Sequence, residues 1–423
     1  MELDDRQDGR RSIGTDTQLF DILGAMSSSE TISTTRLLRS SALWVLYALL
    51  GLFAFVQSMI GPAVPFLRAE FHLDYSAAAM HMSAFALGQM ASGLLSPLII
   101  RRFGIHRVLW GGMLGILVGI SGLVLAPTPI LSLASILFMS LTGTLSLSCL
   151  QASISQLGGE HRSQALMEGN MAASAAGAAA PFVLVAGVAL GLGWRALWPA
   201  FAVGLAATAL FGRKPIARSV PDSIIEESDS RGDRLPRAFW RLYILIFFAV
   251  GVEWSVGFWA TEYLKGLPGH SVSLAAAGAG VFQIAAVSGR LVCSRLTGRI
   301  KEKRILITAM VLTAIGFPLY WLRAQPVTAF LGLTLCGLGV SAFYPLSLSL
   351  SIGAAKGRTA AASSLAAVAS GAAIFTMPLL LGLVADSAGL RTALWSIPLG
   401  LGIMALLLIS GRRSEAGSRE SPD

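Results

Sequence analysis

Residues 242–264 form the stretch LYILIFFAVGVEWSVGFWATEYL, an apolar run with one carboxylate, Glu253, at its centre and another, Glu262, near its end. About 20 apolar residues allow a helix to cross the roughly 30 Å of hydrocarbon in a bilayer. Twelve such segments recur along the chain: 42–66, 76–100, 108–125, 130–154, 165–189, 196–211, 242–264, 274–296, 305–322, 327–352, 360–385 and 392–409. Lipid offers no partner for free backbone groups, so the spanning element must be a helix. These runs predict an all-α membrane protein with twelve transmembrane helices.

The composition agrees with this fold class. Hydrophobic residues make up 54% of the 423 residues and charged residues only 13%, whereas soluble domains carry about 25% charge. The net charge of +9 forms no basic stripe with interleaved aromatics, so we expect no nucleic-acid partner. The cysteines Cys149, Cys293 and Cys336 all fall inside apolar segments without metal-ligand spacing, so we expect neither a metal site nor a disulfide.

Lysine and arginine orient the predicted bundle. Of the 32 basic residues, 26 lie in the two tails or in and beside the even-numbered connections, five lie in the odd-numbered connections, and Arg290 lies inside the eighth segment. Because Lys and Arg concentrate on the cytoplasmic side of such proteins, both termini are predicted to be cytoplasmic, in a multi-pass protein of the inner membrane.

Polar stretches divide the chain further. Residues 1–40 read as a disordered cytoplasmic tail, residues 212–241 as a cytoplasmic linker, and residues 411–423 as a cytoplasmic C-terminal tail. The linker separates two predicted six-helix halves, residues 41–211 and 242–410.

An internal repeat supports this division. Four pairs of like residues share an offset of 197: Arg102 and Arg299, Arg107 and Arg304, Pro181 and Pro378, Trp198 and Trp395. Because each half has an even number of segments, both halves keep the same orientation, as in parallel repeats around an axis along the membrane normal.

Twelve segments in two halves, with basic loops after the second and eighth, resemble the major facilitator superfamily. The loop Arg101-Arg102-Phe103-Gly104-Ile105-His106-Arg107 matches the family signature with Arg101 in place of its usual Asp, and Gly298 to Arg304 is a second, more divergent copy. The proline of the fifth-segment antiporter motif is present as Pro181, without the glycine before it. Segments around residues 168–170, 251–259 and 344–345 are similar to the fucose-permease branch.

The resemblance implies alternating access between two halves that rock about a central cavity. It places gating at the basic loops, so Arg101, Arg102, Arg107 and Arg299 are candidate gating residues, together with Arg290. It also places segments one, four, seven and ten around the cavity, with segment eight close by.

Glu253 is the leading candidate for proton coupling. A charge at bilayer depth costs at least ~2.5–3.5 kcal/mol, and burial favours the protonated form of a carboxyl group. A structural hydrogen bond to a neighbouring helix is the alternative. Glu168 is a second candidate, although capping of the fifth helix would also explain it. Arg290 could clamp an anionic substrate, pair with a carboxylate or snorkel to the interface. Glu262 and Asp386 lie near segment ends, where we expect interfacial solvation.

Polar and aromatic side chains inside the segments are candidates for solute binding, with helix–helix hydrogen bonds as the alternative. The predicted substrate-binding residues are Gln57, Gln151, Asn170, Trp254, Trp259, Gln283 and Tyr344. His81 and Gln89 are weaker candidates of the same kind.

These patterns predict a monomeric secondary active transporter in the lipid bilayer, moving a small organic solute, with protons as the coupling ion. A sugar-like polar solute competes with export of a lipophilic drug or metabolite. An enzyme would need a nucleophile with its base, or a metal cluster, and the sequence offers neither arrangement. A sensor would need a folded cytoplasmic domain, for which the longest loop is too short. No phosphate-binding loop is present, so we expect no nucleotide or other cofactor.

Overall fold

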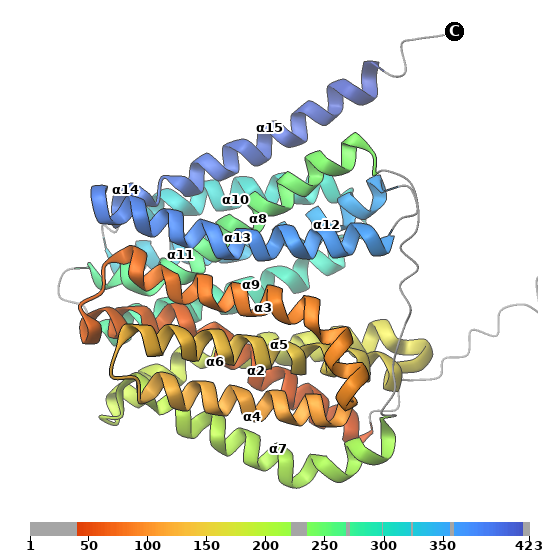
Figure 1. The fold of residues 1–423 in the computed structure, drawn as a ribbon. Helices are drawn as coiled ribbons and strands as arrows, with labels where there is room; N and C mark the ends of the chain where they lie inside the picture. Colours follow the sequence, from red (N-terminus) through yellow and green to blue (C-terminus); the bar gives the residue numbers. More distant parts are fainter. Residues whose placement is uncertain are drawn as a thin grey trace, which may run out of the picture. The chain divides into compact units, whose positions relative to one another are not determined.

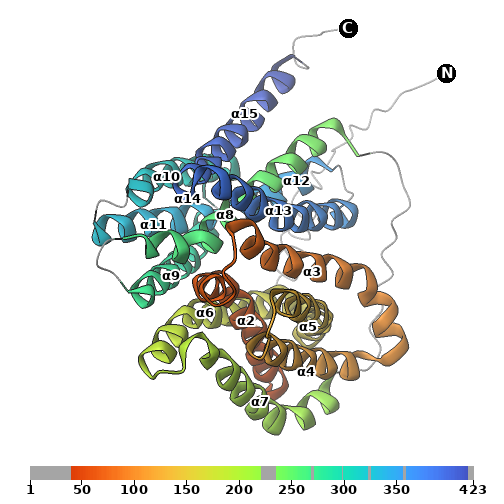
Figure 2. The ribbon, with the colours of Figure 1, turned by 60° about the vertical axis from the view of Figure 1, so that its left-hand side comes forward.

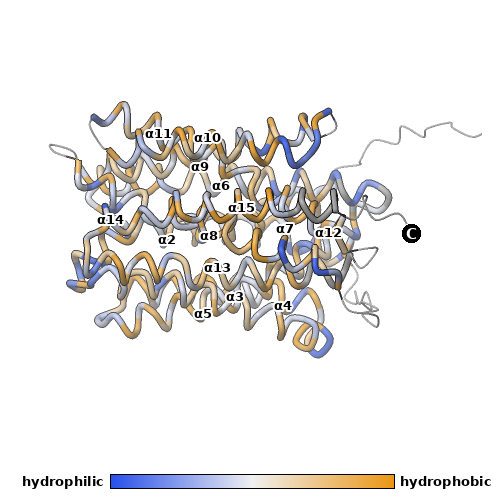
Figure 3. Tube along the Cα trace, turned by 90° about the horizontal axis from the view of Figure 1, so that it is seen from above, coloured by the Kyte–Doolittle hydropathy of each residue, from blue (hydrophilic) through white to orange (hydrophobic). Residues whose placement is uncertain are grey.

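The computed structural model of the protein describes residues 40–220, 235–267, 271–297, 299–322, 325–355 and 359–417. Within these ranges all regular structure is helical, and twelve segments are long and apolar enough to cross a membrane (Figure 1). The prediction of an all-α protein with twelve transmembrane helices is confirmed. Figure 3 shows hydrophobic residues along the spans and hydrophilic residues gathered toward their ends.

The first six spans are α2 (Ser41–Phe71), α3 (Tyr75–Phe103), α4 (Ile105–Val124), α5 (Pro129–Gly158), α6 (Arg162–Ala189) and α7 (Leu197–Ser219), with short 3-10 turns η1 (Gly159–His161) and η2 (Gly193–Ala196). The last six are α8 (Arg237–Lys265), α9 (Val272–Leu296), α10 (Glu302–Leu322), α11 (Pro326–Val340) with α12 (Phe343–Ala354), α13 (Thr359–Ala388), and α14 (Leu390–Ala393) with α15 (Ser396–Gly417).

Local sequence explains several helix ends. The Ser40 side chain accepts a hydrogen bond from the Leu43 amide at the start of α2, and Thr128 caps α5 through the Leu131 amide. Gly104 alone separates α3 from α4 with φ of 80°, a conformation that disfavours other residues. The glycine of the predicted loop motif therefore permits the reversal between the second and third spans.

Some boundaries differ from the sequence interpretation. The sixth span continues to Ser219 and the seventh begins at Arg237, so both ends of the predicted 212–241 linker are helical; residues 221–234 lie outside the described ranges. The tenth span consists of two helices that are interrupted at Ser341 and Ala342. Residues 1–39 of the predicted N-terminal tail also lie outside the described ranges.

The spans pack in two groups. Helix α4 packs on α5, α2 on α6 and α3 on α5, while α10 packs on α11, α9 on α11, and α8 on α12, α13 and α15 (Figures 1 and 2). Among the described residues, the groups are connected by α2 with α8, α3 with α13 and α6 with α9, and less extensively by α2 with α9. We call α2–α7 the first group and α8–α15 the second group.

Small residues allow the closest approaches within a group. A Cβ built on Gly112 of α4 would lie 2.5 Å from the Thr142 carbonyl oxygen of α5. A Cβ built on the adjacent Gly111 would have no neighbouring atom within 4 Å. Close packing of backbones through small residues is the usual basis of helix association in lipid, where the hydrophobic effect between helices is absent.

This contrast gives a matched test of packing. Gly112→Ala should destabilise the protein by about 1–3 kcal/mol, because the new methyl group overpacks the α4–α5 contact. Gly111→Ala, which adds the same methyl group one residue away in open space, should leave stability unchanged or slightly higher. Thermal unfolding of the two purified variants in detergent measures the difference, and equal midpoints would contradict the packing described here.

Candidate functional site

An ion pair lies deep in the second group. The guanidinium of Arg290 on α9 donates through Nη2 to Oε1 of Glu253 on α8, at 2.8 Å. Glu253 is near the middle of its span, where a lone charge costs about 2.5–3.5 kcal/mol or more. Pairing compensates that cost, and in this conformation Arg290 contacts a carboxylate, one of the alternatives considered for it. The Arg290 side chain is still 46% exposed and that of Glu253 is 16% exposed.

The pair borders the interface between the two groups. Gln283 and Arg290 are seven residues apart and therefore share one face of α9. On that face, Gln283 Nε2 donates to Ser58 Oγ of α2 at 3.3 Å. Glu253 lies one turn before Gly257, whose carbonyl oxygen approaches Gly61 of α2. Helices α2, α8 and α9 thus meet beside the pair.

Further polar groups surround this meeting point. Tyr344 of α12 lies close enough to Glu253 for an electrostatic interaction between them. Gln57 and Trp254 are half-buried on α2 and α8, next in sequence to Ser58 and Glu253. The structure therefore places Tyr344 near Glu253, and Gln283 on the same face of α9 as Arg290.

One end of the bundle is closed by polar contacts between the groups. Arg68, at the end of α2, forms an ion pair with the buried Glu262, at the end of α8. The Arg68 guanidinium also lies 3.7 Å from the centroid of the Tyr75 ring of α3. Trp259 is fully buried against the same Tyr75 ring. We call this region the closed end.

Helices α3 and α13 complete the closed end. The backbone amides of Tyr75 and Ser76, in the first turn of α3, donate to the Asp386 carboxylate of α13 at 2.6 and 3.0 Å. A carboxylate is favoured there because the first amides of a helix have no intrahelical acceptor. Ser83 Oγ of α3 also donates to the Phe375 carbonyl oxygen of α13, at 2.7 Å.

These contacts correct the expectation of simple interfacial solvation for Glu262 and Asp386. The sequence places the ends of the first and seventh spans on one side of the membrane. This topology is compatible with a contact between Arg68 and Glu262. The position of Asp386 opposite the first turn of α3 depends on how the groups dock, and no sequence pattern indicates it.

The other predicted residues lie apart from the ion pair. Glu168 of α6 accepts from Tyr47 Oη of α2 at 3.4 Å and from Gln164 Nε2 at 3.1 Å. Gln151 and Asn170 are exposed on α5 and α6, and Trp259 belongs to the closed end. The candidate gating residues outside the pair are exposed at the opposite end of the bundle: Arg101, Arg102, Arg107 and Arg299. Their roles stay predictions.

His81 has a structural environment. Its Nε2 lies 2.8 Å from Ser132 Oγ of α5, and its Nδ1 faces the carbonyl oxygens of Ala77 and Ala78. This matches the helix–helix alternative for His81. Among the described residues, no group of three His, Cys, Asp or Glu side chains could hold a metal ion.

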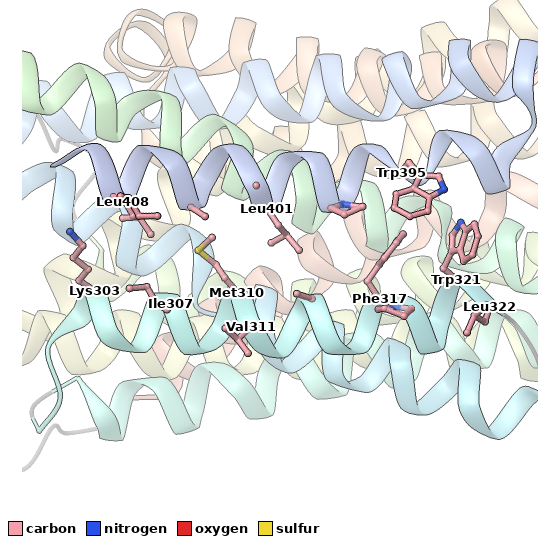
Figure 4. A pocket seen from close by; sticks show the side chains of 16 residues that line it. Lys303, Ile307, Met310, Val311, Phe317, Trp321, Leu322, Trp395, Leu401 and Leu408 are labelled. Atoms are coloured by element: carbon pink, nitrogen blue, oxygen red, sulfur yellow. The ribbon is translucent and has the colours of Figure 1, made fainter. Parts of the chain in front are cut away.

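A separate groove lies between α10 and α15, with a volume of about 630 Å³. Figure 4 shows Lys303 at one end and Trp321 and Trp395 at the other, with aliphatic side chains between them. Both helices belong to the second group, and none of the lining residues is on a helix of the first group. The groove is therefore distinct from the region of the ion pair.

The closed end yields a test of its own. Glu262→Gln should loosen the contact between α2 and α8, because the partly buried guanidinium of Arg68 loses its charged partner. A cysteine placed at the buried Ser83 would report this opening by its rate of maleimide labelling, since the native cysteines are buried. We expect roughly tenfold faster labelling in the Glu262→Gln background, equivalent to about 1.4 kcal/mol.

Glu70→Gln provides the matched control, because Glu70 pairs with Arg195 inside the first group, with both side chains well exposed. Labelling of the Ser83→Cys protein that is equally slow with and without Glu262→Gln would show that the ion pair does not hold this end shut.

Comparison with known proteins adds a family match. The family model described as Major Facilitator Superfamily matches residues 46–307 and 242–422. An uncharacterized MFS-type transporter of Yersinia pestis is 26% identical over 357 residues, which cover 82% of this chain and 88% of that protein.

Solved structures share the fold at low sequence identity. A bacterial homolog of the human lysosomal transporter Spinster, in an inward-facing and unoccupied conformation, has a TM-score of 0.70 at 16% identity, covering 91% of this chain and 99% of the other. The nucleoside transporter NupG has a TM-score of 0.70 at 13% identity, covering 88% and 98%. The fucose:proton symporter FucP of E. coli has a TM-score of 0.58 at 18% identity, covering 86% and 97%.

Proposed function

Because this chain belongs to the major facilitator superfamily, and is thus a membrane transporter and not an enzyme, we propose that it moves a small organic solute by alternating access, driven by protons through Glu253. The observation that carries the proposal is the Glu253–Arg290 pair at depth beside the interface of the two groups. A carboxylate that is held at this depth by one cation has the chemistry of a proton-loading group.

The polar closure of one end supports alternating access. Contacts that join the groups gather at the closed end, whereas Arg290 is about half exposed although it lies inside a span. We therefore describe this conformation as open toward the side that carries the chain termini. Breaking the Arg68 and Asp386 contacts, with closure of the opposite end, would expose the same pair to the other side.

A polar solute fits the surroundings of the pair better than a lipophilic one. Tyr344 offers a hydroxyl group near Glu253, and Gln283 offers an amide on the face of α9 that carries Arg290; both side chains are partly accessible. The apolar groove between α10 and α15, which would suit a lipophilic molecule, does not reach the interface between the groups. The polar lining supports a sugar-like solute over export of a lipophilic compound.

Replacement of the carboxylate tests the proton role. Glu253→Gln should abolish uphill accumulation of solute in proteoliposomes with an imposed pH gradient, because a neutral amide can neither load nor release a proton. Binding and downhill exchange of the solute should persist, since the amide keeps the shape of the carboxyl group. Glu70→Gln, at an exposed pair in the first group, should accumulate solute like the parent. Undiminished accumulation by Glu253→Gln would sink the proton role.

We place both termini in the cytoplasm and the protein, as a monomer, in the inner membrane. The uneven distribution of basic residues supports this orientation. A green fluorescent protein fused after Asp423 should therefore fluoresce, because it matures in the cytoplasm. Alkaline phosphatase at the same position should stay inactive, because it matures only in the periplasm. The reverse result would invert the orientation and, with it, the side to which the pair is open.

A further inference from the structure

The direction in which Arg290 extends is unusual for its position. Arg290 lies six residues before the end of α9 at Leu296, or about 9 Å at 1.5 Å per residue. Arginine side chains at this depth ordinarily extend toward the nearby interface. Arg290 instead reaches Glu253, near the middle of α8, on the face of α9 that also carries Gln283. The cation is therefore held where a solute between the groups would meet it.

Charge balance then limits which solute is compatible with proton coupling. Away from the ends of the described spans, Glu253 and Arg290 are the one pair of opposite charges, and together they are neutral. A proton on Glu253 alone would leave Arg290, a half-exposed cation inside a span, without its counter-charge. An anion bound at Arg290 alone would leave one negative charge in excess. Binding both together keeps the site neutral, and an uncharged solute offers no such balance.

The chemistry of the guanidinium indicates the kind of anion. Only Nη2 of Arg290 is engaged by the Glu253 contact, whereas a guanidinium presents five N–H donors in a fork that fits a carboxylate in a bidentate manner. We propose that the transported solute is an organic acid whose carboxylate replaces that of Glu253 on Arg290, and that one proton on Glu253 accompanies each singly charged acid. This inference rests on the proposed function and narrows its polar solute to an acidic one.

The pH dependence follows from this exchange. The charged or titratable groups that face Glu253 from the helices packed on α8 are Arg290 of α9 and Tyr344 of α12, among the described residues. A carboxylic acid that is fully ionised between pH 6 and 8 should therefore bind more tightly as the pH falls, by up to tenfold per pH unit, because its binding takes up one proton.

The experiment compares acids with neutral relatives by thermal stabilisation of the purified full-length protein at pH 6 and 8. The probes are glucuronate against glucose, lactate against glycerol, and benzoate against benzyl alcohol. We expect at least one acid to stabilise the parent more than its neutral relative does, and more at pH 6 than at pH 8. In Glu253→Gln the same acid should bind without pH dependence, and in Arg290→Gln its effect should be lost.

Arg295→Gln is the matched control, since Arg295 is exposed on the same helix and faces no described carboxylate within ion-pair distance. Folding of Arg290→Gln is checked by its own melting temperature and by the double variant with Glu253→Gln, which removes both charges together. In proteoliposomes, uptake of the acid should carry no net charge, so a potassium diffusion potential should leave its accumulation unchanged.

The inference is overturned if the neutral relatives stabilise as well as the acids, if no acid shows pH-dependent stabilisation, or if Arg290→Gln retains the effect. If a neutral probe is accumulated with a proton gradient, and this accumulation depends on Glu253, the proposed function stands and the inference of an acidic solute is wrong. If an acid binds at Arg290 and Glu253→Gln accumulates it undiminished, the inference of an acidic solute stands and the proton role of Glu253 is wrong.

Discussion

Hydrocarbon neither hydrogen-bonds a backbone group nor solvates a charge, and the structure follows from both constraints. The first makes every described span a helix, because a helix satisfies its own amides and carbonyl oxygens. The second requires each charge away from the membrane surface to find a partner. Arg290 pairs with Glu253, and Glu262 pairs with Arg68. Each contact overcomes the tendency of a long charged side chain to reach water.

Packing between helices has a different basis. Apolar side chains gain little by leaving lipid for another apolar surface, so close approach of backbones becomes decisive. Gly112 of α4, packed against α5, is an example from within one group, and Gly61 against the Gly257 carbonyl oxygen is an example between the groups. Few polar contacts join the groups among the described residues, and in the proposed cycle these contacts could be exchanged without disrupting either group.

The sequence predicts most of this architecture because hydrophobicity and length alone define spanning helices. It also identifies Glu253 and Arg290 as charged residues within the spans, where the free-energy cost of a charge rises with distance from the membrane surface. It does not predict that they pair, or that Asp386 meets the first amides of α3. Those contacts depend on the angle at which α8, α9 and α13 pack, which is set by many side chains together. The sequence does not predict the helical ends of the 212–241 stretch. Where a helix extends beyond the membrane it carries polar residues, and its composition then resembles that of a linker.

The two ion pairs on α8 differ in a way that matters for mechanism. Glu262 pairs with Arg68 of the other group, so separation of the groups at the closed end must break that contact. Glu253 pairs with Arg290 of its own group, so the same separation leaves it intact. In the proposed cycle, conformation therefore controls the first pair, and a proton or solute at the site controls the second. Because both carboxylates belong to one helix, we propose that a shift of α8 on rearrangement of the Glu253–Arg290 pair would act directly on the Arg68–Glu262 contact at the closed end.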